Sequence, residues 1–411
     1  MTTSIGRVPP NLIVDFDVYD PGLAAPKDVM QEKVAELAAL GPVVYSNHYG
    51  GHWIVTHYKE AHQVLTDPQT FSSYPNNLVT NELLGKFIPL ELDPPEHTAY
   101  RKALQPLFSP QRMKALTDKI RGVVNDLIDG FADKGEVEFV SEFAHELPAR
   151  IFLALMDWPL ADAPLFSKAT DTILFGKPGG TEEESNQARM EAGFQMFGYF
   201  QNVVEQRRSN PGEDVTSKLI HTEVDFLDGT RLLTDEELNR MFFLLLIGGL
   251  HTVKGSLCWG VWHLAQRPEI RDRIVADPSL IPTAVEEILR YEAAVVPGRR
   301  ATRDVELGGV KIAKDDQLII MLCGVNRDGA EFPEPLKFDI ERQPNRHLSF
   351  GAGPHRCLGS HLGRIELNVA FTELHRRIPD YQLVESDPPV WHSSQVRGCV
   401  RLPITFTPEK K

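Results

Sequence analysis

The segment around Cys357 carries the clearest chemical signal in the sequence. Residues 350–359 read Phe-Gly-Ala-Gly-Pro-His-Arg-Cys-Leu-Gly, and the glycines at positions 351, 353 and 359 let the backbone approach a large flat group because they carry no Cβ. A helix is predicted to begin at Ser360, and the free N–H groups at its start would stabilise a thiolate. A thiolate beside a glycine-lined wall can serve as the axial ligand of a haem iron. The alternative for a lone cysteine is an inert buried thiol.

A second group of residues could move protons. Gly248 and Thr252 are four positions apart in the run Gly-Gly-Leu-His-Thr-Val over residues 248–253, so they share one helix face. A small residue at position 248 opens a groove for dioxygen, and the Thr252 hydroxyl can donate and accept hydrogen bonds there. The ordinary alternative is that a threonine within a helix bonds back to a carbonyl of its own helix.

A resemblance to a known family connects these residues. Residues 350–359 meet every fixed position of the pattern Phe-Gly-x-Gly-x-His-x-Cys-x-Gly, the haem-binding signature of the cytochrome P450 family. Glu287 and Arg290 resemble the family's Glu-x-x-Arg pair, and Arg342 fits the arginine that meets this pair. The resemblance implies that Cys357 binds the iron and that the three charged residues hold the cysteine side of the core together.

The likeness covers nearly the full chain and is greatest to soluble bacterial monooxygenases of the camphor-hydroxylase type. Matching segments stand in the same order at residues 87–89, 93–96, 246–250 and 298–299. The resemblance implies a mainly α-helical cytochrome P450 fold with small β-sheets and a long central helix over the haem. It also implies a monooxygenase that inserts one oxygen atom of O₂ into its substrate. Two alternatives stay open: a haem enzyme driven by hydrogen peroxide, and a non-catalytic haem or gas-binding sensor.

Haem b carries two propionates, which a buried site should meet with cations. The spacing of His97 and Arg101 resembles the family's His-x-x-x-Arg propionate clamp, although such a pair alone would be a solvated pair on a helix surface. The resemblance assigns six residues to the cofactor: His97, Arg101, Arg299 and His355 to the propionates, and Gly351 and Gly359 to its face.

His251 departs from the family pattern. The family usually places an acid directly before the threonine that helps protons reach the oxygen activated by the haem, and Thr252 fits that threonine. An imidazole can also relay protons near neutral pH, so we predict that His251 replaces the acid as a slower or differently gated relay. The alternative is that His251 pairs with a carboxylate or a carbonyl and only tunes the geometry of the helix.

The substrate pocket is expected to be apolar. Carried over by position, its candidate residues are Phe87, Leu244, Ile247, Gly248, Val295 and Val396. Such a set favours a small or medium hydrophobic molecule, such as a terpenoid or an aromatic compound, although each residue could equally be core. Camphor itself is disfavoured, because Gly85 and Lys86 stand where camphor-type enzymes present a hydroxyl-bearing aromatic residue.

Electrons are expected to come from separate proteins. The sequence shows neither a dinucleotide-binding glycine pattern after a strand nor the cysteine spacing of an iron–sulfur cluster. The resemblance implies a [2Fe–2S] ferredoxin and its NAD(P)H-dependent flavin reductase. A basic group on an acidic protein would suit the docking of an acidic ferredoxin, although solvated surface charge is the alternative; its members are Arg101, Lys102, Arg356 and Arg364.

The elements that must position these residues can be read from the pattern. Thr234 and Glu237 form a capping-box pattern at the start of an apolar segment that continues to about Gln266, which predicts a buried helix of roughly 30 residues. From Leu104 to about Tyr291 nearly everything is predicted to be helical. Short strands are predicted on either side of that region, at residues 43–45, 52–56, 305–307, 310–312 and 317–321.

Composition limits the class of protein. The 411 residues include 43 Lys+Arg and 57 Asp+Glu, a formal charge of −14 that argues against a nucleic-acid binder. The four cysteines form no CxxC pair, which fits a reducing compartment. The first 20 residues show no secretory signal, and the longest apolar run, Met241–Leu250, is about half of the ~20 residues of a membrane span. We therefore expect a cytoplasmic protein without a membrane segment, built as a single domain over residues 1–411.

Overall fold

The computed structural model describes residues 8–25, 27–79 and 85–410. The first seven residues of the segment examined for a secretory signal lie outside this range. The helices of the described chain are α1 (Met30–Leu40), α2 (Tyr58–Thr66), α3 (Glu96–Leu104), α4 (Pro110–Ala115), α5 (Thr117–Asp129), α6 (Glu146–Met156), α7 (Ala163–Phe175), α8 (Glu182–Ser209), α9 (Val215–Ile220), α10 (Asp235–Ala265), α11 (Pro268–Ala276), α12 (Ile281–Tyr291), α13 (Leu322–Val325) and α14 (Ser360–Arg377).

The strands form one larger sheet and several small ones. They are β1 (Ile13–Val14), β2 (Val43–Ser46), β3 (His52–Val55), β4 (Phe71–Ser72), β5 (Glu136–Glu138), β6 (Glu223–Phe226), β7 (Gly229–Leu232), β8 (Gly298–Ala301), β9 (Val305–Leu307), β10 (Val310–Ile312), β11 (Gln317–Ile320), β12 (Gln382–Leu383), β13 (Val390–His392), β14 (Gly398–Arg401) and β15 (Pro403–Thr405). The larger sheet has the order β1-β2-β3-β11-β8-β4. Its parallel pair places β3, from the first part of the sequence, beside β11, from the last part.

Helix α10 is the long central helix that the sequence predicts. The Thr234 side chain accepts a hydrogen bond from the Glu237 backbone, and the Glu237 side chain accepts one from the Thr234 backbone, so the predicted capping box is present. The helix is long and apolar enough to meet the criteria for a membrane span, but 67% of its most apolar window is buried inside the structure. Burial to that extent is what the core helix of a folded domain shows.

The five predicted strands are confirmed as β2, β3, β9, β10 and β11, and one region is corrected. The predicted hairpins correspond to β2–β3 and β9–β10, and the turn of the first contains Tyr49, Gly50 and Gly51 at positive φ. The region predicted as almost all helix contains β5 and the hairpin β6–β7. The Asp228-Gly229 pair at the tip of that hairpin is a typical hairpin-turn sequence, which the prediction of a nearly all-helical region did not take into account.

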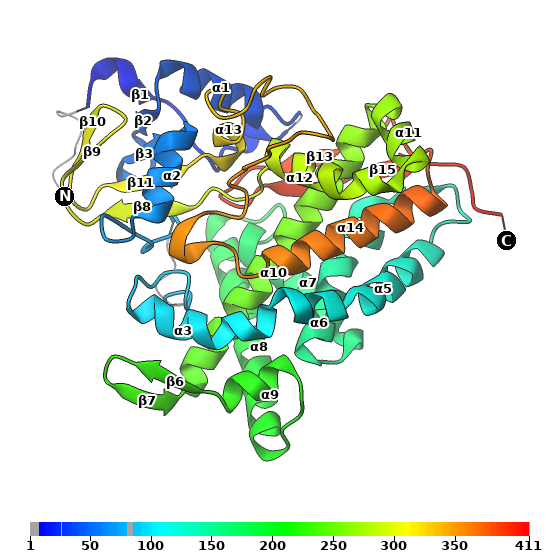
Figure 1. Cartoon of the computed structure of the whole chain (residues 1–411), viewed down its shortest axis with the longest axis horizontal. Helices are drawn as coiled ribbons and strands as arrows, with labels where there is room; N and C mark the ends of the chain where they lie inside the picture. The colour runs from blue at the N-terminus through cyan, green and yellow to red at the C-terminus, as the bar shows by residue number, and fades with distance from the viewer. Residues whose placement is uncertain (1–7, 26, 80–84, 411) are drawn as a thin grey trace.

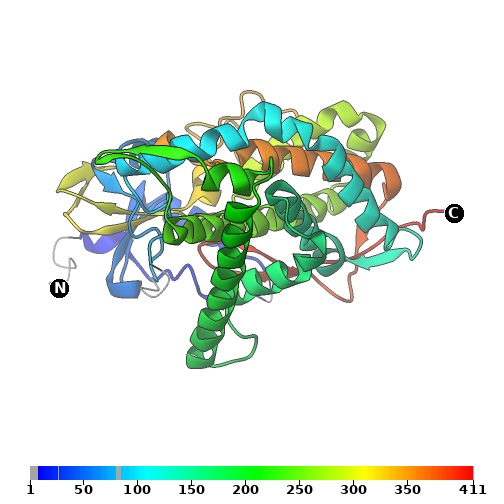
Figure 2. The ribbon, with the colours of Figure 1, turned by 90° about the horizontal axis from the view of Figure 1, so that it is seen from below.

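The described chain has two hydrophobic cores, and residues of the cysteine segment pack against both. The larger core packs the helices α3–α12 and α14, and the smaller one packs α1, α2 and α13 against the larger sheet. Figure 1 shows the β-rich part, with the N-terminus, at one side of the helical part. Seen from below in Figure 2, α8 crosses α10, against which it packs. The cavity described next is lined from both cores, by Leu65 and Leu322 of the smaller and by residues of α10 and α14 from the larger.

Candidate active site

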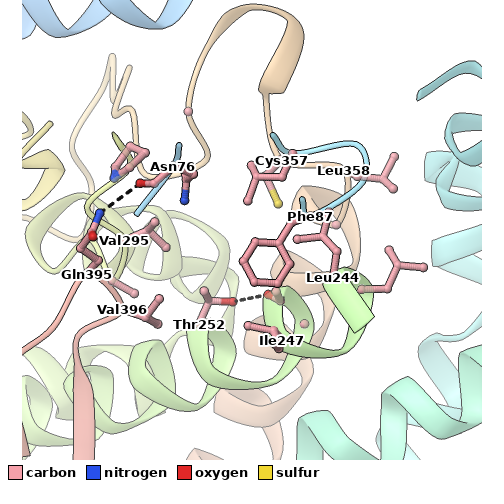
Figure 3. Close-up of a pocket in the computed structure, with 18 of the residues that line it drawn as sticks. Asn76, Phe87, Leu244, Ile247, Thr252, Val295, Cys357, Leu358, Gln395 and Val396 are labelled. Carbon is pink, nitrogen blue, oxygen red and sulfur yellow. Dashed lines mark hydrogen bonds between the residues drawn. The ribbon is translucent and has the colours of Figure 1, made fainter. Parts of the chain in front are cut away.

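A cavity of about 1440 Å³ lies between α10 and the segment that contains Cys357. Figure 3 shows Cys357 on one side of this cavity, with Thr252 and Ile247 of α10 facing it from the other side. Most of the lining surface is apolar, and the polar residues come from several segments, among them α3, α8, β8 and the cysteine segment. A space of this size can hold both a large cofactor and a substrate.

The cysteine segment is folded by its own backbone. The Cys357 N–H donates to the Phe350 carbonyl at 2.8 Å, and the Gly351 N–H donates to Leu348 at 2.7 Å. Gly351 and Gly353 both have φ of +67°, where a side chain would be strained. At Gly353 a Cβ would also lie 2.5 Å from the Leu65 carbonyl, so this glycine is needed for packing against α2. Gly351 and Gly359 line the cavity, as their assignment to the cofactor requires.

The ionisation of Cys357 is set by two opposed effects. Burial raises the pKa of the Cys357 thiol, whereas the Gly359 backbone N–H and the positive charges of Arg101, Arg364 and Arg356 act to lower it. The net direction is upward, so the start of α14 alone does not make this residue a thiolate. A coordinating metal ion deprotonates a bound thiol outright, and the nearby N–H and cations then stabilise the charge that remains.

Histidine and arginine side chains meet at the edge of the cavity nearest α3. The rings of His97 and His355 lie 4.2 Å apart between centroids. His97 Nδ1 and His355 Nε2 are buried without a hydrogen-bond partner in the described chain. Burial lowers the pKa of His97 to about 4 and that of His355 to about 2, so both rings are neutral in the protein alone.

Among the described residues neither Arg101 nor Arg299 forms a direct ion pair, although the charge of Asp93 acts to raise the pKa of Arg299. Arg299 is 3% exposed and donates to the Gly298 carbonyl at 2.7 Å, and burial lowers its pKa to about 10. Arg101 donates to the Arg356 carbonyl at 2.5 Å. A buried Arg299 and a half-buried Arg101 beside unpartnered ring nitrogens suit an anionic ligand with several oxygens. The two propionates of a haem would fit these side chains, and Cys357 could then hold its iron.

Thr252 lies where α10 borders the cavity. Its Oγ1 donates to the Gly248 carbonyl at 3.1 Å, the ordinary bond of a helical threonine, and Ser256 Oγ donates in turn to the Thr252 carbonyl at 2.9 Å. All three residues line the cavity, and a Cβ at Gly248 would meet nothing within 4 Å. The helix therefore presents an open groove with a hydroxyl that can exchange its intrahelical bond for one to a ligand.

His251 lies on the other side of α10 and does not line the cavity. Its ring is 2% exposed, and Nε2 lies 3.5 Å from Asp171 Oδ1 in α7. Lys254 Nζ lies 3.1 Å from the same oxygen, and His145 Nε2 lies 3.1 Å from Asp171 Oδ2. Burial and the charge of Lys254 hold the pKa of His251 well below its usual range, with Asp171 opposing them. The proton-relay role of His251 stays a prediction, and it requires a path around α10.

The candidate pocket residues all lie on the cavity wall. These are Phe87, Leu244, Ile247, Gly248, Val295 and Val396. Phe87 stacks on Phe243 of α10, with ring centroids 6.0 Å apart and ring planes 4° from parallel. Val295 and Val396 pair as an isolated antiparallel bridge, which brings two distant segments to the same wall. In Figure 3 these two valines lie on the side of the cavity opposite Leu244 and Leu358.

Glu287, Arg290 and Arg342 meet beneath the cysteine segment. Arg290 donates to both Glu287 oxygens at 2.7 Å, and Arg342 Nε lies 3.2 Å from Glu287 Oε2. Arg290 also donates to the carbonyls of Asn326 and Pro335 at 2.9 Å each. The three residues thus fasten α12 to the irregular chain that leads to Cys357.

Two residues of the site were missed by the sequence interpretation. Asp171, the carboxylate beside His251, is 80 positions upstream of it and stands in no motif. Glu366 lies on α14, lines the cavity and is 3% exposed, with Oε2 unpartnered in the described chain. Burial alone raises the pKa of Glu366 to about 8. A buried acid nine residues after the cysteine is not distinguishable, in sequence, from an ordinary helix-surface glutamate.

Comparison with known sequences gives a consistent family. Residues 169–378 match the family model described as Cytochrome P450. The chain is 38% identical over 371 residues to the methyl-branched lipid omega-hydroxylase of Mycobacterium tuberculosis, covering 87% of this chain and 84% of that protein. It is 32% identical over 388 residues to the 6-deoxyerythronolide B hydroxylase of Saccharopolyspora erythraea, covering 90% and 94% of the two chains.

Solved structures agree with the sequence comparison. The crystal structure of CYP101J2 superposes with a TM-score of 0.87 at 31% identity, covering 99% of this chain and 100% of that one. The structure of P450BioI in complex with hexadec-9Z-enoic acid-ligated acyl carrier protein gives a TM-score of 0.83 at 28% identity, covering 92% and 98%. The fold and the family inferred from the cysteine segment are both confirmed. With these relatives and this cavity, the chain belongs to the cytochrome P450 family, as a haem-dependent monooxygenase.

Proposed function

We propose that this monooxygenase inserts one oxygen atom of O₂ into a small or medium hydrophobic substrate, such as a terpenoid or an aromatic compound. The observation that carries the proposal is the apolar wall that faces the Cys357 side of the cavity across the Thr252 groove. Apolar walls bind a substrate mainly through the surface they remove from water. The names of the two relatives, one a hydroxylase of a branched lipid and one of 6-deoxyerythronolide B, also fit a hydrophobic substrate.

The cofactor in this proposal is haem b. Cys357 would ligate its iron, His97, Arg101, Arg299 and His355 would meet its propionates, and Gly351 and Gly359 would border its face. When bound, a haem with a thiolate ligand would supply oxygen chemistry in which electron density donated by the sulfur favours cleavage of the O–O bond. Thr252 would hold a hydrogen-bonding hydroxyl over the groove, and the aromatic and aliphatic wall would keep water from the reacting carbon.

Electrons would come from a [2Fe–2S] ferredoxin and its NAD(P)H-dependent flavin reductase. The basic group expected at the cysteine side is only partly free in the structure. Arg364 is paired with Glu286 at 2.7 and 2.8 Å, and Arg101 turns inward to the Arg356 carbonyl. Lys102 and Arg356 are exposed and, among the described residues, have no ion-pair partner. These two would attract an acidic ferredoxin to the side of the molecule from which the cysteine segment is reached.

Two further parts of the proposal concern the whole chain. Because the cavity draws its lining from both cores, we treat residues 1–411 as one functional domain. We also place the protein in the cytoplasm, where a ferredoxin and NAD(P)H are at hand.

A spectral screen followed by turnover tests the proposed function. Terpenoids, aromatics and fatty acids are added to the haem-loaded protein, and compounds that shift the Soret band are then incubated with NADH, a ferredoxin and its reductase. We expect an oxygenated product from at least one compound. Thr252→Ala should bind that compound unchanged but form about tenfold less product per NADH. Two results would contradict the proposal. One is product that forms with hydrogen peroxide but not with NADH, the ferredoxin and its reductase, and the other is no product from any bound compound.

A further inference from the structure

Asn76 places a side-chain amide on the cavity wall next to Val295 and Val396, where Gln395 also lines the cavity. It belongs to the segment between β4 and α3, and it lines the cavity together with Val295 and Val396. Figure 3 shows Asn76 on the same side as these two valines, away from Leu358. The residue is 9% exposed, and its Oδ1 has no hydrogen-bond partner in the described chain. The Nδ2 of the same amide donates to Asn77 Oδ1 at 3.3 Å, so the unsatisfied atom is the acceptor.

The backbone of Asn76 is held on three sides. Its N–H donates to Glu91 Oε1 at 2.9 Å, and its carbonyl accepts from Gln395 Nε2 at 3.2 Å. A Cβ at Gly298 would lie 2.2 Å from that carbonyl, so the Asn76 segment approaches the start of β8 as closely as a glycine allows. The position of the amide is therefore fixed by the protein before any ligand binds.

The same carboxylate positions the aromatic wall. Glu91 is 5% exposed, and its Oε2 accepts from the Phe87 N–H at 3.0 Å, while its Oε1 holds Asn76. One buried side chain thus sets the distance between the amide and the aromatic ring. A rigid molecule that packs on Phe87 would be oriented by the polar group that it places against the Asn76 side chain.

An unpaired buried acceptor is costly, and a ligand can remove the cost. A buried polar group without a partner loses its bond to water and gains nothing in return. Since the terminal torsion of asparagine is soft, Oδ1 can turn toward a ligand without moving the backbone. The partner of Oδ1 must be a hydrogen-bond donor, because an amide oxygen only accepts hydrogen bonds.

We propose that Asn76 is a specificity-determining residue, and that the substrate is an apolar molecule bearing a hydroxyl group that donates to its Oδ1. This inference rests on the proposed function, because it assumes that the cavity receives a hydrophobic substrate. It narrows that substrate to an alcohol or phenol whose carbon skeleton packs on Phe87, Val295 and Val396. Glu91 is then a positioning residue, which acts through Asn76 and Phe87.

Two rigid probes of the same shape test the proposal. 2-Adamantanol offers a hydroxyl donor, whereas 2-adamantanone offers only an acceptor, and both are titrated into the haem-loaded protein while the Soret shift is followed. We expect the alcohol to bind about tenfold or more tightly than the ketone. Asn76→Leu should remove this preference. Equal affinities, no binding of the alcohol, or a preference that survives in Asn76→Leu would overturn the proposal.

A matched control separates a role in recognition from a general effect of losing an amide. Asn368 on α14 also has an unpartnered Oδ1 but does not line the cavity, so Asn368→Leu should keep the preference for the alcohol.

Thermal unfolding without ligand gives an independent readout of the role of Asn76. Asn76→Leu should be at least as stable as the wild type, since it removes an unsatisfied polar group, and a marked loss of stability would contradict the inference. The test of the proposed function measures product per NADH and does not involve Asn76. A result against the role of Asn76 would therefore leave the proposed function standing.

Discussion

The ion pairs beneath the cysteine segment and those behind α10 each surround one carboxylate with basic side chains, but they differ in how far solvent reaches that carboxylate. Glu287 and Arg290 are 0% exposed, and they bond to each other and to side-chain and backbone groups of the neighbouring chain, including the Asp339 N–H. The Asp171 side chain is 39% exposed although its partners His251 and Lys254 are almost fully buried. One group is closed, and the other joins solvent to the protein interior.

This difference in solvent exposure indicates that the two groups of charges have different roles. A closed group of charges fixes the shape of the chain around it, because separating any member leaves a buried charge uncompensated. A group with one exposed carboxylate can exchange protons with solvent while its buried members stay in place. The first group would serve the geometry of the Cys357 segment, and the second would serve the protonation of α10.

Substitution in the closed group should have the largest effect. Glu287→Gln leaves Arg290 and Arg342 without a counter-charge, so we expect a loss of about 3–5 kcal/mol in the free energy of unfolding, measured by denaturant titration. The control is Glu286→Gln at the preceding residue, whose side chain is 28% exposed and pairs with the partly exposed Arg364 and the buried His347. That variant should lose less than half as much. Equal losses in the two variants would remove the distinction between closed and open groups.

Substitution of His251 tests whether the open group moves protons. We compare wild type, His251→Ala and His251→Asp for product formed per NADH consumed, with a compound found in the spectral screen. If the ring relays protons, His251→Ala should lower this ratio several-fold, and His251→Asp should restore at least part of it. The same ratio in all three proteins would remove the relay role and leave His251 as a packing residue.

The pH dependence of stability distinguishes Asp171 from its neighbours. Burial acts to raise the pKa of Asp171, but hydrogen bonding from His145 and the charge of Lys254 outweigh it and hold the pKa below its usual value. Because the folded pKa lies below the unfolded one, this stabilisation is present above about pH 4 and is lost as the pH falls further. Asp171→Asn should therefore be less stable than wild type at pH 7, and the gap should close in acid. A gap independent of pH would contradict this.

Glu366 should show the opposite sign, with a smaller effect. Its folded pKa of about 8 lies above that of the unfolded chain, so the folded state keeps a proton that the unfolded state loses. The resulting stabilisation is complete below about pH 4 and declines as the pH rises to about 8. The stability of wild type relative to Glu366→Gln should fall over this range in calorimetry. No change with pH would show that Glu366 is ionised in the folded protein.

The sequence was sufficient wherever a function depends on neighbours along the chain. The capping box of α10, the position of Cys357 before α14, and the groove at Gly248 and Thr252 all follow from local spacing and from the family pattern. Glu287 and Arg290 are readable for the same reason, since they are three apart on α12.

The rest depends on contacts between distant segments. Nothing in the sequence near His251 indicates Asp171, and nothing near Phe87 indicates that Glu91 also holds Asn76. The neutral state of Glu366 depends on burial by several elements, which periodicity cannot measure. The basic group at the cysteine side was overestimated for a related reason: Glu286, the partner of Arg364, comes from α12 and is invisible in the local sequence.

The carbon monoxide spectrum of the reduced protein tests the central claim most directly. If Cys357 ligates the iron as a thiolate, the ferrous protein with carbon monoxide should show the long-wavelength Soret band that is diagnostic of sulfur ligation. Cys357→Ser should lose that band, while Cys258→Ser, a buried cysteine of α10, should keep it. Absence of the band in the wild type, or its persistence in Cys357→Ser, would contradict the account.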